Sequence, residues 1–76
     1  MRLEEAIKDI AIGKFRVIKR IGTACEDNNY SITLEYDNIH KAIQEARRRN
    51  DEASEAGRSM YFYVADDEGN IIFPDE

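Results

Sequence analysis

Residues 30–56 read YSITLEYDNIHKAIQEARRRNDEASEA, and within them an alternating pattern gives way to a helical one. Apolar and polar residues alternate strictly over 30–36, which predicts a strand with one buried and one wet face, as in an antiparallel sheet. From residue 38 to residue 56, apolar residues recur every three or four positions, which predicts a helix. The apolar positions are Tyr30, Ile32, Leu34 and Tyr36 in the strand, and Ile39, Ala42, Ile43, Ala46 and Ala53 in the helix.

Two helices are predicted, each with a residue that can end it. Asp37 or Asn38 can cap the first turn of the 38–56 helix, and Gly57 follows its last turn. Residues 2–12 carry a shorter apolar stripe, which predicts a helix that ends at Gly13. A helix this short is marginal alone, so we expect it to dock on the rest of the chain.

The three consecutive arginines Arg47, Arg48 and Arg49 lie within the longer predicted helix. Consecutive residues spread around a helix axis, so the run does not form one basic stripe. Glu45 precedes Arg49 by one turn, and Glu52 follows Arg48 by one turn, so we expect two ion pairs. The run therefore predicts a solvated helical surface in preference to a binding patch.

Three further strands are predicted, over residues 14–21, 59–65 and 71–73. Residues 22–29 are rich in turn formers and predict a loop. Between the last two strands, the acidic segment Asp66–Asn70 predicts a hairpin turn in which Gly69 takes a positive φ. Pro74 ends the last strand because it has no amide hydrogen to donate.

These elements predict an α+β fold in one small domain over residues 1–76, in the order α-β-β-α-β-β. We expect a four-stranded, mostly antiparallel sheet with both helices on one face. The large apolar residues of this face form the predicted core: Leu3, Ile7, Ile10, Phe15, Val17, Ile32, Leu34, Ile39, Ile43, Phe62 and Val64.

The stretch over residues 37–72 resembles the small bacterial ββαββ domains. The resemblance is carried by Ala42, Ala46, the Tyr61–Val64 strand and Gly69. The preceding strand hairpin and the alanine-bearing helix also resemble HicB-like antitoxin domains, but the glycine and proline signals of that family's second strand are absent. We therefore assign the chain to neither family, and the resemblance implies a fold without implying an activity.

Composition excludes several classes of protein. A chain of 76 residues is too short for a second domain and has little apolar material for lining a deep pocket. The net charge of −5 opposes binding to nucleic acid and anionic membranes on average. The single cysteine, Cys25, cannot form an internal disulfide, and no apolar run has the length of a signal peptide or membrane span. We expect a cytoplasmic protein that does not bind membranes.

No set of residues predicts catalysis, a metal site or a cofactor. Cys25 lies beside Glu26 and Asp27, whose charges oppose thiolate formation. His40 is the only histidine, and one histidine with one cysteine does not make a zinc site within a single chain. The spacing of the acids in Asp66–Asn70 does not match a calcium-binding loop, so a solvated turn is the simpler interpretation.

The sheet face opposite the helices is the strongest candidate for binding. It is predicted to display Arg16, Ile18, Arg20, Tyr61 and Tyr63. Tyrosine and arginine are enriched at protein interfaces, so our first hypothesis is a non-enzymatic domain that binds a protein partner or another copy of itself as a homo-oligomer.

Two alternatives remain open. Aromatic rings beside cations can also stack the bases of single-stranded nucleic acid, which makes nucleic-acid binding on the same face the second hypothesis. A third would be an enzyme whose site is shared between subunits and uses Cys25 or His40.

Overall fold

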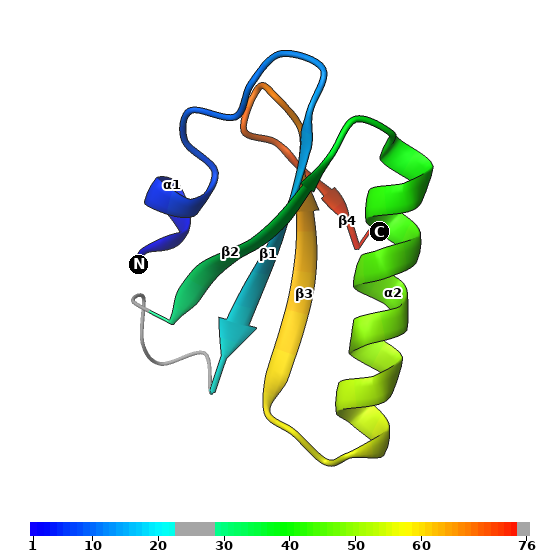
Figure 1. Ribbon diagram of the computed structural model, residues 1–76. Helices are drawn as coiled ribbons and strands as arrows, with labels where there is room; N and C mark the ends of the chain where they lie inside the picture. The colour runs from blue at the N-terminus through cyan, green and yellow to red at the C-terminus, as the bar shows by residue number, and fades with distance from the viewer. Residues whose placement is uncertain (23–28, 75–76) are drawn as a thin grey trace.

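The computed structural model describes residues 1–22 and 29–74, and it confirms the predicted α+β fold and element order (Figure 1). The elements are α1 (Leu3–Ala6), β1 (Phe15–Ile21), β2 (Tyr30–Tyr36), α2 (Ile39–Glu55), β3 (Met60–Ala65) and β4 (Ile71–Phe73). The strands form one antiparallel sheet in the order β2-β1-β3-β4. Cys25 and most of the predicted 22–29 loop lie outside the described residues.

Helix α2 covers one face of the sheet and lies close to it because its inner side chains are small. Ala42 and Ala46 are fully buried and pack with Val17, Phe62 and Val64. At the start of the helix, the side chain of Asn38 accepts hydrogen bonds from the backbone amides of the first turn, as predicted. Gly57 follows the helix with a φ of 67°.

Strand β2 contains a β-bulge that separates its apolar residues onto two faces. Val17 of β1 lies opposite Leu34, but the next residue, Ile18, lies opposite Ile32, which leaves Thr33 as the extra residue. Leu34 therefore shares the α2 side of the sheet with Val17, whereas Ile32 shares the other side with Ile18. The prediction that the apolar residues of this strand share one buried face is wrong, and both Ile32 and Leu34 are exposed on an edge strand.

The segment that begins with α1 packs on the opposite face of the sheet from α2, so the prediction of both helices on one face is wrong (Figure 1). Ala6 and Ile10 form a second buried cluster with Ile18 and Ala65. Because Ile18 follows Val17 in the same strand, the two side chains point to opposite sides of the sheet. Both faces carry apolar residues, and each requires its own cover.

Helix α1 is one turn long, although a helix was predicted over residues 2–12. In a longer helix the carbonyl of Ala6 would accept a hydrogen bond from the amide of Ile10. Here Nη1 of Arg16 donates to that carbonyl at 2.8 Å, and Asp9 adopts a φ of 58°, which a right-handed helix does not allow. The arginine thus provides a hydrogen-bond donor for a carbonyl at the end of the short helix, which allows the chain to turn back to the sheet.

The core is smaller and richer in alanine than predicted. Ile32, Leu34 and Ile39 are exposed, which contradicts their assignment to the core. Val17, Phe62, Val64 and Ile10 are buried as predicted, with Ile10 in the second cluster, on the side of the sheet opposite α2. Alanine side chains fill much of the remaining interior because they allow the helical segments to approach the sheet closely; these are Ala6, Ala42, Ala46, Ala53 and Ala65.

The acidic turn between β3 and β4 is a structural element. The Oδ1 atom of Asp66 accepts hydrogen bonds from the amides of Glu68 and Asn70, and Gly69 has a φ of 82°, as predicted. Asp67 accepts a hydrogen bond from the amide of Gly13 at 2.9 Å. The turn therefore uses its acidic side chains to hold itself and the segment before β1.

Candidate functional site

The predicted binding residues all lie on the sheet face opposite α2. Strand pairing places Ile18 between Ile32 and Tyr63, and Arg20 between Tyr30 and Tyr61. Directly opposed residues of antiparallel strands project to the same side of the sheet. All five predicted residues therefore share one face: Arg16, Ile18, Arg20, Tyr61 and Tyr63.

Arg16 and Ile18 are not exposed on this face, contrary to the prediction. Ile18 is fully buried beneath the N-terminal segment, and Arg16 is 7% exposed. Besides the carbonyl of Ala6, the guanidinium of Arg16 donates to the carbonyls of Lys8 and Asp9, and its Nε atom donates to Glu35 at 2.7 Å. These contacts satisfy the arginine within the chain, so neither residue can reach a partner without moving this segment.

The remaining residues form an aromatic cluster, which we call the tyrosine patch and define as Arg20, Tyr30, Ile32, Tyr61 and Tyr63. The ring centroids of Tyr61 and Tyr63 are 5.2 Å apart, and those of Tyr30 and Tyr63 are 6.4 Å apart. All three rings are tilted with respect to their neighbours and half-buried. Ile32 beside them is 44% exposed. The sequence did not indicate that Tyr30 and Ile32 belong to this face, because the bulge that places them there leaves no clear sequence signal.

Arg20 is held against the ring of Tyr63. Its guanidinium carbon lies 5.7 Å from the ring centroid, a distance at which cation and ring attract each other. Its Nε atom is buried and has no hydrogen-bond partner among the described residues. Burial raises the pKa of the Tyr63 hydroxyl, while the charge of Arg20 acts in the opposite direction. The patch is therefore a partly desolvated aromatic surface with one cation.

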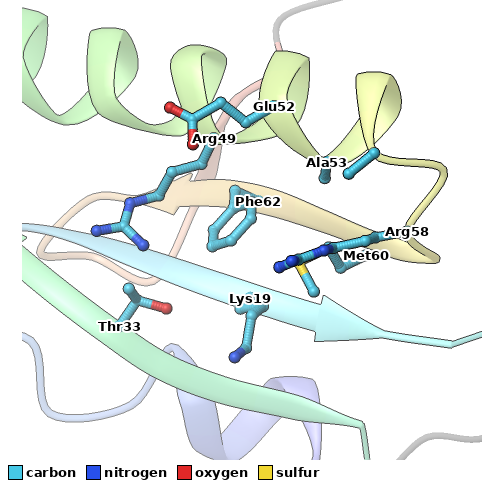
Figure 2. A pocket seen from close by; sticks show the side chains of 9 residues that line it. Lys19, Thr33, Arg49, Glu52, Ala53, Arg58, Met60 and Phe62 are labelled. Carbon is cyan, nitrogen blue, oxygen red and sulfur yellow. The ribbon is translucent and has the colours of Figure 1, made fainter.

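The other side of the sheet has an open hollow beside the C-terminal half of α2 (Figure 2). Its volume is about 370 Å³. Three cationic side chains, Lys19, Arg49 and Arg58, stand around it, with Met60 and Phe62 among its apolar lining. We call this site the cationic hollow. Nothing in the sequence predicted it, although Lys19 was the one polar residue on the otherwise apolar side of its strand.

The three consecutive arginines have separate roles, as their spread around the helix implies. Arg47 lies over the ring of Phe73, at 5.8 Å from the centroid. Arg48 forms ion pairs with Glu45 and Glu52, and Arg49 pairs with Glu45 through Nε, which confirms the two predicted pairs.

Two hydrogen-bonding arginines stabilise the charged form of Glu45. The bonds from Arg48, followed by that from Arg49, lower the pKa of the Glu45 carboxyl. This carboxylate therefore remains charged at neutral pH and holds the guanidinium of Arg49 in place.

The residues considered for chemistry are not brought together. His40 is exposed in the first turn of α2, and Cys25 lies outside the described residues. Over residues 1–22 and 29–74, no three side chains of histidine, cysteine, aspartate or glutamate are grouped as metal ligands. Within the same residues, no helix is long and apolar enough to cross a membrane.

No protein-family model matches the chain, and no curated protein or solved structure is significantly similar to it. We therefore infer the function from the geometry of the tyrosine patch and of the cationic hollow.

Proposed function

We propose that this chain is a non-enzymatic interaction domain that binds a second copy of itself through the tyrosine patch. The observation that supports the proposal is the cluster of Tyr30, Tyr61 and Tyr63 beside the exposed Ile32, on a sheet face that the N-terminal segment covers only in part. Tyrosine offers a large contact area with few rotatable bonds and is enriched where protein surfaces meet.

The charge of the patch suits a symmetric partner. Arg20 is its only charged member, so two copies can face each other without bringing many like charges together. In a two-fold dimer the same patch of both copies meets, so the tyrosine rings of one copy would face the patch that holds Arg20 of the other. A standard interface covers about 800 Å² on each partner. The accessible surface of the chain is 5124 Å², so such an interface would use less than a fifth of it.

Nucleic-acid binding on the same face is the weaker candidate. Tyrosine rings can stack bases, but a single-strand site also needs several cations to follow the phosphates. Arg16 is committed to Glu35 and to backbone carbonyls, so Arg20 is the one arginine of the predicted pair that remains on the surface. The net charge of −5 opposes the approach of a polyanion.

Two substitutions in β2 test the proposal with a matched control. Ile32 and Leu34 are 44% and 39% exposed, but they lie on opposite sides of the sheet. Ile32→Glu should abolish dimer formation in sedimentation equilibrium, because it places a carboxylate in the patch of both copies. Leu34→Glu adds the same charge to the same strand and should leave the dimer intact.

A wild-type chain that stays monomeric at millimolar concentration would refute self-association. Equal loss of the dimer in both variants would show that the interface lies elsewhere. Binding of a single-stranded oligonucleotide by that monomer, weakened steeply by salt, would favour the nucleic-acid alternative.

A further inference from the structure

The cationic hollow concentrates positive charge in an acidic chain. Among the described residues, Lys19 and Arg58 form no ion pair or side-chain hydrogen bond, although the chain has 16 acidic residues. Glu52 is the acidic residue at the rim, and Arg48 pairs with it. Clustered like charges repel one another, so an anion that neutralises them would be stabilised here.

Arg49 is positioned in advance for such a ligand. Glu45 holds its Nε atom, and its guanidinium carbon lies 5.7 Å from the centroid of the Phe62 ring. Its two terminal nitrogens make no hydrogen bond within the described residues. Glu45 holds one edge of the guanidinium, and the Phe62 ring lies against one of its faces. The terminal N–H groups can therefore bind an oxyanion with little loss of conformational freedom. Figure 2 shows the Arg49 and Arg58 side chains extending over the sheet on either side of Phe62.

The β-bulge in β2 contributes a hydroxyl to the same hollow. Thr33 is the extra residue of the bulge, and its side chain lines the hollow with Lys19. Bulges recur beside functional sites because they redirect a side chain that regular pairing would place elsewhere. The threonine hydroxyl can donate one hydrogen bond to an anionic group.

The electrostatic balance at this end of α2 favours an anion. The carbonyls at the C-terminus of a helix act as about half a negative charge, which would repel an anion. The two unpaired cations, Lys19 and Arg58, together carry two positive charges and exceed that effect. Met60 and Phe62 add an apolar lining. The volume of about 370 Å³ lies within the range of about 300–1,000 Å³ that is usual for small-molecule sites.

We propose that the cationic hollow binds a small organic anion that carries at least two carboxylate or phosphate groups beside an apolar portion. Lys19, Arg49 and Arg58 would hold the anionic groups, Thr33 would donate a hydrogen bond, and Met60 would contact the apolar portion. The hollow lies across the sheet from the tyrosine patch, so this site does not depend on self-association.

The test is a titration of the ¹⁵N-labelled chain with phthalate, which carries two carboxylates on an apolar ring, and, separately, with citrate, which carries carboxylates without such a ring, followed by amide chemical shifts. We expect saturable shifts at Lys19, Thr33, Arg58 and Met60. Arg58→Gln should weaken binding at least tenfold, and its side chain is exposed, so the fold should survive. Lys19→Gln should weaken binding to the same extent. Its thermal unfolding midpoint should match that of the wild type, which shows that the weaker binding does not result from unfolding.

Lys14→Gln is the matched control, because Lys14 is exposed, has no side-chain partner among the described residues, and carries the same charge. It should leave the affinity unchanged. Equal weakening by Lys14→Gln and Arg58→Gln, or shifts that do not saturate, would show a general charge effect and overturn the proposal. Tighter binding of a glutamate-rich peptide than of either small anion would also overturn it, by assigning the hollow to a polypeptide.

Discussion

Arg16 of β1 and Glu35 of β2 are directly opposed across the sheet and joined by a hydrogen bond of 2.7 Å from Nε to Oε2. The same guanidinium ends α1 by donating to the carbonyl of Ala6. One buried side chain thus connects the N-terminal segment to both strands. It also explains why a residue predicted to bind a partner instead stabilises the fold.

Arg16→Gln should lower the free energy of unfolding by about 3 kcal/mol, because it leaves buried carbonyls without donors and removes the partner of Glu35. Urea denaturation followed by circular dichroism measures the change. Glu35→Gln should cost less, because the Glu35 side chain is 35% exposed and water can replace its bonds. Lys14→Gln, on the surface, should change stability by less than about 0.5 kcal/mol. Equal losses for Arg16→Gln and Lys14→Gln would contradict this role.

Asn50 should protect the Phe62 amide, in the middle of β3, from hydrogen exchange. Its side-chain amide donates to the carbonyl of Phe62 at 3.2 Å and accepts from the amide of Phe62 at 2.7 Å, at an edge that the short strand β4 does not reach. Asn50→Ala should therefore cost about 1–3 kcal/mol and speed hydrogen exchange at the Phe62 amide. Gln44→Ala, on the exposed surface of the same helix, should leave that exchange rate unchanged. Unaltered exchange in Asn50→Ala would refute the role.

Tyr63 should ionise above the usual tyrosine pKa of about 10, because its hydroxyl is partly desolvated. A raised folded-state pKa means that the folded chain holds this proton more tightly than the unfolded chain does. The corresponding stability is present below pH about 10 and is lost as pH rises toward the folded-state pKa. Tyrosinate absorbance should show the late titration, and Tyr63→Phe should remove it. The stability of Tyr63→Phe should also fall less steeply over this range. An ordinary titration for all four tyrosines would contradict the desolvation of Tyr63.

Glu45 should titrate below the usual glutamate pKa of about 4.3, because Arg48 and Arg49 donate hydrogen bonds to its charged form. A lowered folded-state pKa contributes stability that is present above the unfolded-state pKa and is lost as pH falls through the folded-state pKa. Carboxyl ¹³C shifts measure the titration directly. Glu45→Gln should flatten the stability profile below pH about 5 relative to that of the wild type. A Glu45→Gln profile with the wild-type slope would contradict this role of Glu45.

Local patterns predicted the elements well because each depends on neighbours in sequence. The alternation over Tyr30–Tyr36 and the helix from Ile39 to Glu55 follow from side-chain period and end signals. The helix predicted over residues 2–12 failed because a residue further along the chain, Arg16, binds the carbonyl of Ala6. This hydrogen bond comes from a residue outside the segment, so the spacing of apolar residues within 2–12 could not predict it.

The candidate sites were harder to predict, because they depend on which face a residue occupies. The alternation of side chains along a strand was enough to place five residues on one face, and the strand pairing confirms this placement. The five residues are Arg16, Ile18, Arg20, Tyr61 and Tyr63. The extra residue in β2, Thr33, could not be located from the sequence, so the positions of Ile32 and Leu34 were misassigned. The cationic hollow combines residues from three strands, from α2 and from the connection between α2 and β3, and sequence spacing does not reveal such a combination.

The tyrosine patch is proposed as the surface through which two copies meet. Amide chemical shifts of the ¹⁵N-labelled chain, recorded over a hundredfold range of concentration, test it most directly. We expect concentration-dependent shifts at Arg20, Ile32, Tyr61 and Tyr63, with constant positions for Lys41 and Gln44 on the outer surface of α2. Self-association through the patch would be contradicted by shifts at the α2 residues without shifts in the tyrosine patch. It would also be contradicted by constant amide positions throughout the chain up to millimolar concentration.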